Sequence, residues 1–198
     1  MSVPAPDDRF RGGAGRLCLD FIRTLRHRGQ PEESEELPDT AALSAWVGQF
    51  GPWPYVPKPA SAGQDALARE LREAIHELIA ATRGPQGPSG FSSRERGTVN
   101  ATALLPVPAP QLEKSGGIRW HAADPTLATL ALIARDALDL VSSPAIARVH
   151  ECANDDCHAL FLDSSRPGTR RWCSMNTCGN KAKKENLRGR GAATLAGG

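Results

Sequence analysis

The sequence predicts a mainly α-helical protein with a small β-hairpin, in which a helical N-terminal body is followed by a C-terminal treble-clef-like zinc finger. Three observations support this fold class. Apolar residues recur at helical spacing in several segments of the first 144 residues. Four of the five cysteines fall in the last quarter of the chain, in two short-range pairs. Basic residues gather in that same quarter, which sets its composition apart from the rest.

The length of 198 residues, 40% of them hydrophobic, suffices for one ordinary globular domain with a small appendage. The opening MSVPAPDDRFRGG lacks the basic start, apolar run and cleavage site of a secretory signal. No apolar stretch reaches the roughly 18 residues that cross a bilayer. We therefore expect a cytoplasmic protein without membrane contact, whose clustered cysteines stay reduced and hold a metal.

Two amphipathic helices are predicted near the N-terminus. The first covers residues 16–26, and Cys18 lies on its apolar stripe, where a small core residue is expected. The second follows an acidic loop. Asp39 or Thr40 can cap its start, and Gly51 ends it.

The third helix, about residues 64–83, has the clearest apolar stripe in the chain. His76 projects from the opposite face, so we expect it to be solvated. A Gly/Pro/Ser loop follows, and Ser92 or Ser93 begins a weaker helix that runs to about Leu105.

The segment QLEKSGGIRWHA is typical of a β-hairpin with Gly116 and Gly117 as a two-residue turn. The next helix has Asp124 as its N-cap and Pro125 at its first position. It stops before Pro144, which we take as the domain boundary. The predicted units are a body over residues 1–144, a finger over 145–190 and a disordered tail over 191–198.

The four clustered cysteines follow the pattern C-x4-C, fifteen intervening residues, C-x4-C. They are Cys152, Cys157, Cys173 and Cys178. Four thiolates in two short-range pairs are typical of structural Zn²⁺, held in a closed tetrahedron with no position open to substrate. Disulfides or an iron–sulfur cluster are the alternatives. His150 or His158 could replace a cysteine as ligand, but the spacing favours four sulfurs.

The segments around the cysteines predict a treble-clef-like shape. Residues 148–151 are short and extended, the turn ANDD follows, and residues 159–163 pair back as a strand. Cys178 lies near the start of a terminal helix. Between Ser164 and Arg190, eight basic residues face one acidic residue, a net charge of +7, whereas the rest of the chain carries −5.

The stretch LFLDSSRPGTRRWCSMNTCGNKAKKENLRGR resembles the CGNR zinc finger, and LCLDFIRTLRHRG followed by LPDTAALSAWV resembles the ABATE domain that usually precedes it. The resemblance implies a bacterial, stress-induced transcription regulator with Zn²⁺ on the four cysteines. Two residues depart from the pattern. Lys181 replaces the arginine of the CGNR tetrapeptide and loses its planar fork, and Arg23 stands where an asparagine is expected.

We therefore predict a zinc-dependent, DNA-binding transcription regulator and not an enzyme, since the body shows no paired acid and base. The body would dimerise, sense a small-molecule effector, or both. Asn180 is expected to support the metal site by bonding back to the first cysteine turn. Seven basic residues are candidates for contact with DNA phosphates: Arg170, Arg171, Lys181, Lys183, Lys184, Arg188 and Arg190.

Two alternatives remain at this point. The finger could be a protein-interaction adaptor that docks an acidic partner or the body itself, without direct DNA binding. The hairpin residues Arg119, Trp120 and His121 could line a ligand pocket or active site, although an ordinary exposed strand explains them as well.

Overall fold

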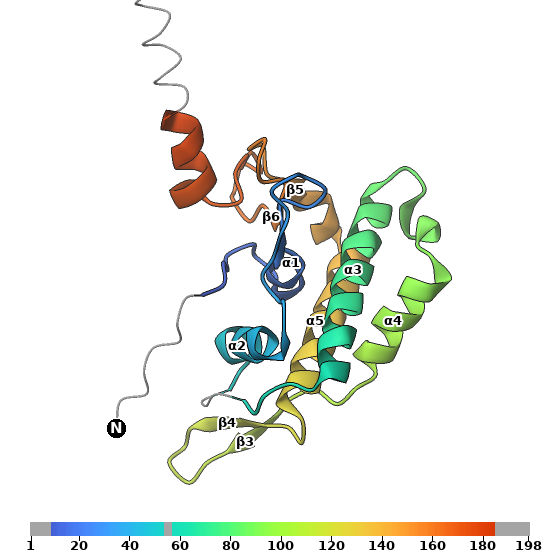
Figure 1. The fold of residues 1–198 in the computed structure, drawn as a ribbon, viewed down its shortest axis with the longest axis vertical. Coiled ribbons are helices and arrows are strands. Elements are labelled where there is room, and N and C mark those ends of the chain that lie inside the picture. The colour runs from blue at the N-terminus through green and yellow to red at the C-terminus, as the bar shows by residue number, and fades with distance from the viewer. Residues whose placement is uncertain (1–8, 54–56, 185–198) are drawn as a thin grey trace, which may run out of the picture.

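The computed structural model describes residues 9–53 and 57–184. This part of the chain contains helices α1 to α5, the start of a further helix at residues 180–184, and three antiparallel pairs of short strands. The mainly α-helical fold is confirmed. The helices form one body, with the cysteine-rich region at one end of the long axis and the hairpin of the body at the other (Figure 1). No described helix is long and apolar enough to cross a membrane.

The first helix is shorter than predicted. α1 spans Leu17–Ile22 rather than residues 16–26. It ends because the backbone N–H and the hydroxyl of Thr24 both donate to the carbonyl of Phe21, at 3.1 and 2.7 Å. Such a local bond competes with continuation of the helix. Cys18 is fully buried, as expected, and burial raises the pKa of its thiol.

The predicted helix starts of the body are largely confirmed. In α2 (Thr40–Phe50), Asp39 is the N-cap and accepts a backbone N–H of the first turn at 2.8 Å. α3 (Ala62–Arg83) begins two residues earlier than predicted, because Ser61 and Gln64 form a capping box. Both helices therefore begin where side chains satisfy backbone donors.

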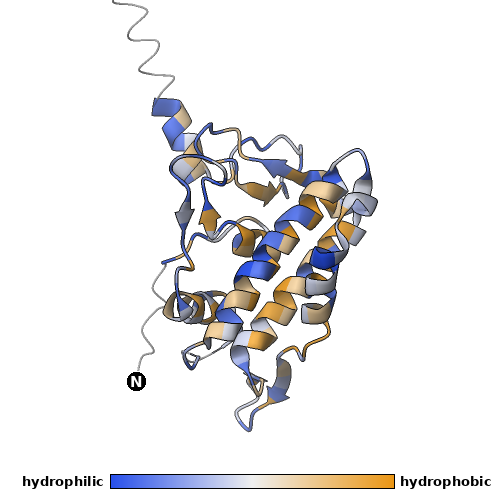
Figure 2. Cartoon of the chain, turned by 45° about the vertical axis from the view of Figure 1, so that its right-hand side comes forward, coloured by the Kyte–Doolittle hydropathy of each residue, from blue (hydrophilic) through white to orange (hydrophobic). Residues whose placement is uncertain are grey.

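Helices α3, α4 (Ser93–Ala103) and α5 (Pro125–Ser142) pack against one another, and α1 and α2 cover α5 and α3. Asp124 caps α5 as predicted, at 2.9 Å. In Figure 2 hydrophobic and hydrophilic bands alternate along the long helices of the body, whereas the described start of the terminal helix is mostly hydrophilic. The largest fully buried side chains are Trp46, Phe21, Phe161, Leu19, Leu37, Leu43, Leu71, Ile75, Ile79, Leu130, Ile133 and Leu140.

The predicted hairpin is present as β3 (Ala109–Leu112) and β4 (Ile118–His121). Its turn differs from the expected Gly116–Gly117 pair. The backbone N–H of Glu113 donates to the carbonyl of Gly117 at 2.8 Å, which leaves three residues in the loop. Gly116 occupies the last loop position with φ +84°, the left-handed conformation that three-residue hairpin loops require.

The cysteine-rich region packs directly on the body. β5 (Val149–Glu151) pairs antiparallel with β6 (Leu160–Leu162), as the sequence predicted. The last N–H of β6 donates to the carbonyl of Ala14 at 2.8 Å. Gly15 adopts φ +90°, and a Cβ there would lie 3.1 Å from β6. Phe161, fully buried, belongs to the same hydrophobic core as the helices.

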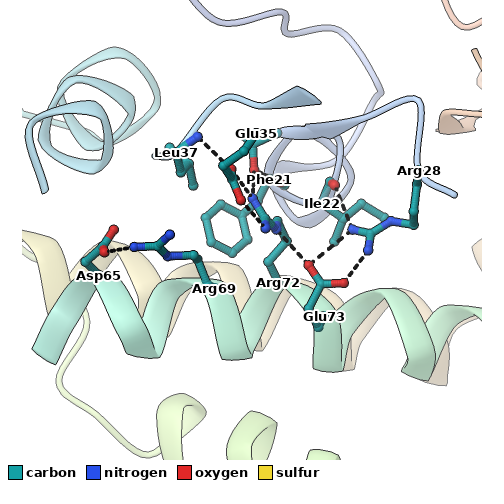
Figure 3. Close-up of polar contacts among 10 residues, drawn as sticks. Phe21, Ile22, Arg28, Glu35, Leu37, Asp65, Arg69, Arg72 and Glu73 are labelled. Carbon is teal, nitrogen blue, oxygen red and sulfur yellow. Dashed lines mark hydrogen bonds and ion pairs between the residues drawn. The ribbon is translucent and has the colours of Figure 1, made fainter. Parts of the chain in front are cut away.

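A strand pair that the sequence did not reveal covers α3. β1 (Leu25–Arg26) pairs antiparallel with β2 (Ser34–Glu35). The guanidinium of Arg72 on α3, 3% exposed, donates to both carboxylate oxygens of Glu35 at 2.6 Å and to Glu73 at 2.9 Å (Figure 3). Glu73 in turn accepts from Arg28, so this network fixes the 25–35 segment to α3.

The network also perturbs the acidity of Glu35. Burial alone would raise the pKa of this carboxyl, but hydrogen bonds from Arg72 and from the N–H of Leu37 outweigh it and lower the pKa. A lowered pKa in the folded state stabilises the protein above the unfolded value of about 4.3, and this contribution is lost as pH falls through the folded value.

Candidate metal centre

The four clustered cysteines come from separate positions and converge on one point. Cys152 follows β5, Cys157 precedes β6, Cys173 follows an extended segment, and Cys178 lies in the π-helical turn Met175–Gly179. Their sulfur atoms all lie within 4.8 Å of one another. The sequence prediction that the two pairs meet is therefore confirmed.

The spacing of the sulfurs fits a zinc ion. The Sγ atoms of Cys157 and Cys173 are 3.6 Å apart, and those of Cys173 and Cys178 are 3.7 Å apart. Four thiolates at 2.3 Å from Zn²⁺ in a tetrahedron would be separated by about 3.8 Å. Three of the four cysteines are buried, and a divalent ion bound there would lock the fold of this small region.

Backbone hydrogen bonds hold the first cysteine turn. The N–H of Cys157 donates to the carbonyl of Asn154 at 2.8 Å, and the buried side chain of Asn154 accepts the N–H of Asp156 at 3.1 Å. The N–H of Cys173 donates to the sulfur of Cys152 at 3.4 Å. These hydrogen bonds orient the first cysteine turn so that its sulfurs face those of Cys173 and Cys178.

The sulfur cluster stabilises one thiolate and disfavours the ionisation of further thiols. A hydrogen bond from Cys173 lowers the pKa of Cys157 to about 4, and the same contact raises the pKa of Cys173. Burial raises the pKa of Cys178 to about 12. Negative charge accumulates as each further thiol ionises, and a divalent cation supplies the charge that allows all four to be thiolates.

Neither histidine joins the sulfur cluster. The Nδ1 atom of His158 lies 2.6 Å from a carboxylate oxygen of Glu151, a contact that raises the pKa of His158. The ring of His150 packs at 6.1 Å from that of Phe161. The preference for four sulfurs over a histidine ligand is therefore supported by where the side chains point.

A body residue also reaches the cluster. Arg23, which follows α1, places Nη2 at 3.9 Å from the Sγ atom of Cys173. Its side chain is 7% exposed and is held by Asp20 at 3.7 Å and by the carbonyl of Gly12 at 3.3 Å. A guanidinium beside thiolate ligands offsets their excess negative charge. The position at which the sequence analysis expected an asparagine thus holds an arginine that contacts the candidate metal site.

Replacing Arg23 with glutamine should weaken zinc binding by about tenfold or more, because the thiolates lose a cationic hydrogen-bond donor. Competition with a chromophoric chelator measures the affinity. Arg16→Gln is the matched control, because Arg16 pairs with Asp136 at 2.8 Å elsewhere on the body. Equal zinc affinity in the Arg23 variant and the unchanged protein would contradict this role.

Asp163 is a second residue whose role the sequence did not indicate. It is fully buried at the end of β6, and its carboxylate accepts the backbone N–H groups of Ser165 and Arg170 at 2.8 and 2.9 Å. The hydrogen bonds from Ser165 are foremost in lowering the pKa of Asp163 to about 2. The carboxylate therefore closes the loop between β6 and Cys173.

Some of the predicted DNA-contacting residues form contacts within the finger, whereas others are exposed to solvent. Arg170 is used internally: its Nε atom donates to the carbonyl of Trp172 at 2.8 Å, and its guanidinium lies 4.7 Å from the ring centre of Phe161. Lys181 forms an ion pair with Asp156. Arg170 thus supports the fold of the finger rather than presenting its charge to a partner.

The other basic candidates are exposed where the structure describes them. Arg171 lies 5.2 Å over the ring of Trp172, and Lys183 and Lys184 project from the helix that begins after Cys178. Arg188, Arg190 and the predicted disordered tail lie outside the described residues.

Asn180 does not take the predicted supporting position. Among the described residues, its amide hydrogen-bonds within its own turn, to the carbonyl of Asn176 at 3.2 Å. It is exposed. The first cysteine turn is held instead by Asn154, as described above.

The alternative site on the hairpin receives no support from the described residues. All four residues of β4 are exposed, Trp120 by 37%. Arg119 lies 4.0 Å from Glu113 of the same hairpin. These residues form an ordinary exposed ladder rather than the wall of a pocket.

Two family models match the chain. The model of ABATE, described as "Putative stress-induced transcription regulator", matches residues 15–144. The model of the CGNR zinc finger matches residues 148–191. Both confirm the resemblances seen in the sequence, and both describe regulator or zinc-finger proteins rather than enzymes. No curated protein matches the chain.

Proposed function

The chain belongs to the ABATE family and carries a CGNR zinc finger, and we propose that it is a zinc-dependent, DNA-binding transcription regulator of the cytoplasm. In this proposal Cys152, Cys157, Cys173 and Cys178 hold one Zn²⁺. The ion supplies no catalysis; it fixes the end of the chain that meets DNA.

One observation carries the DNA-binding part of the proposal. The helix that presents Lys183 and Lys184 to solvent begins directly after the metal ligand Cys178. A fixed cationic helix attracts phosphates without reading bases, and the resulting affinity falls steeply with salt. Arg171, exposed beside Cys173, adds a further cation near the metal. We do not assign a phosphate contact to Arg170, because its donors are engaged within the finger.

The double variant Lys183→Gln/Lys184→Gln should weaken binding to a generic DNA duplex several-fold at low salt. It should also reduce the slope of log affinity against log salt by about 2, one unit for each lost phosphate contact. Mobility-shift or anisotropy titrations of the zinc-loaded protein at two salt concentrations measure both quantities.

The control Lys58→Gln/Arg94→Gln removes the same charge from exposed positions of the body. If Lys183 and Lys184 contribute specifically, this control variant should keep the DNA affinity and the salt slope of the unchanged protein. If the unchanged protein binds no DNA at low salt, the regulator proposal is wrong and a protein-interaction adaptor becomes the better explanation.

We assign the helical body to dimerisation or effector sensing. The hairpin at the far end from the finger (Figure 1) exposes Leu112 and Ile118, 76% and 59% accessible. Exposed apolar side chains of this size favour an interaction between proteins. A dimer would supply the two DNA contacts that a single small finger needs for high affinity.

A further inference from the structure

We propose that a cavity between the body and the finger binds a small organic carboxylate. This inference names the effector class of the regulator and so rests on the proposed function. The cavity has a volume of about 260 Å³, slightly below the range of sites for drug-sized ligands, so it suits a small metabolite.

The two units contribute different walls of the cavity. The body supplies the end of α1 and the β1 region, including Ile22, Leu25 and Arg26. The finger supplies Ala159 and Leu160 beside the cysteines. A ligand seated there touches both units at once.

Hydrogen-bond donors dominate the polar part of the lining. Four arginines, a lysine and three histidines face the cavity, against two carboxylates and the two proposed metal ligands Cys157 and Cys178. These donor residues are Arg11, Arg23, Arg26, Arg28, Lys181, His27, His76 and His158. A ligand that matches this lining must therefore be rich in acceptors, and a carboxylate offers about four acceptor sites in a plane that suits a guanidinium.

The acidic groups of the region are already paired. Glu36 lies 3.3 Å from Arg26, and Asp156 pairs with Lys181. Arg23 is engaged by Cys173 and Asp20, and the network on α3 engages Arg28. Arg26 keeps guanidinium N–H groups beyond its pair with Glu36, because one carboxylate cannot satisfy all five donors.

Arg11 is the arginine of the lining without a polar partner among the described residues. The sequence did not mark it, because it precedes the first helix. His76 was expected to be solvated but is half-buried at the cavity, and burial lowers the pKa of its imidazole. The neutral ring adds a donor without adding charge. Arg11 and Arg26 are thus the guanidinium groups available to an incoming carboxylate.

The apolar part of the lining determines the remainder of the ligand. Ile22, Leu25 and Leu160 present aliphatic side chains to the cavity. A bare inorganic anion would leave these surfaces uncovered, whereas a short aliphatic or aromatic acid buries apolar area against them. The lining therefore favours a monocarboxylate with a small apolar group.

Calorimetric titration of the zinc-loaded, full-length protein tests this proposal. The probes are benzoate and hexanoate, each beside its neutral amide, and inorganic phosphate. We expect saturable binding of a carboxylate, at least tenfold weaker binding of the matching amide, and weaker binding of phosphate. Arg11→Gln and Arg26→Gln should each weaken carboxylate binding by about tenfold, the loss expected for one charged hydrogen bond.

Arg94→Gln is the matched control, because this arginine is 83% exposed on α4, outside the cavity. Arg11→Gln removes no hydrogen bond or ion pair among the described residues, so we expect this variant to keep its fold, which circular dichroism checks. The proposal would be overturned if the protein bound no carboxylate, or if it bound acids and amides equally. It would also be overturned if phosphate bound as tightly as the carboxylates, or if both cavity variants bound carboxylate as well as the unchanged protein does. The titration contains no DNA, so its failure and a failure of DNA binding are separate results.

Discussion

Replacing Cys173 with serine should reduce the zinc content of the purified protein from one ion per chain to nearly none. The Sγ atom of Cys173 lies 3.6 and 3.7 Å from two other sulfurs of the cluster, and it accepts the contact from Arg23. Structural Zn²⁺ contributes about 10–16 kcal/mol in isolated finger peptides. Without it, the short strand pair β5–β6 and the turn at Cys178 would lack most of their stabilisation, and DNA retention should be lost with them.

Zinc content is measured by a metal-sensitive dye after denaturation, and the fold of the finger by near-UV circular dichroism. Cys18→Ala is the matched control, because it removes the one cysteine that lies outside the cluster, in the core beside α5. It should keep one zinc per chain while losing some stability. Full zinc occupancy in Cys173→Ser, or equal loss in both variants, would show that the four-sulfur assignment is wrong.

Replacing Arg72 with methionine should lower the free energy of unfolding by about 3–5 kcal/mol, the cost of breaking a buried ion pair. The change removes the two hydrogen bonds of 2.6 Å that the Glu35 carboxylate accepts from Arg72. This carboxylate lies beneath the β1–β2 strand pair. Because strand β1 forms one edge of the cavity, the Arg72→Met variant should also bind carboxylates less tightly.

Urea denaturation followed by circular dichroism measures this change. Arg94→Met serves as the control, because Arg94 and Glu70 are 83% and 60% exposed and 3.8 Å apart. A surface pair of this kind contributes about 0–1 kcal/mol. Adding Glu35→Gln to Arg72→Met should recover part of the loss, since the stranded charge is then removed. Similar losses in Arg72→Met and Arg94→Met would contradict a structural role for the network.

The features that the sequence predicted well depend on short stretches of chain. Asp39 and Asp124 cap their helices as expected, because a cap is decided by a side chain and the N–H groups of the following turn. The cysteine spacing predicted the cluster for a similar reason, since each pair spans a single turn. Gly116 shows the limit of such reasoning: two adjacent glycines do not reveal which of them takes the left-handed position.

Features that join distant segments were not predictable. Arg72 follows the polar pattern of a surface residue on α3, yet it is buried because β2 folds over it. Arg23 lies 150 positions from Cys173 and reaches it only in the folded chain. The cavity is likewise built from both ends of the sequence. One sequence supplies no signal for such pairs, so the donors around the cavity appeared only as scattered charges.

The hydrogen bond between Ala14 and the end of β6, with Gly15 pressed against the same strand, has a practical consequence. The finger is not an independent unit that could be separated at Pro144 and joined to another protein. A fragment that starts there would uncover the aromatic ring of Phe161 and lose the arginine that approaches the cysteine sulfurs. Exchanging fingers between related proteins should therefore give a folded protein only when residues 10–28 are transferred together with the finger.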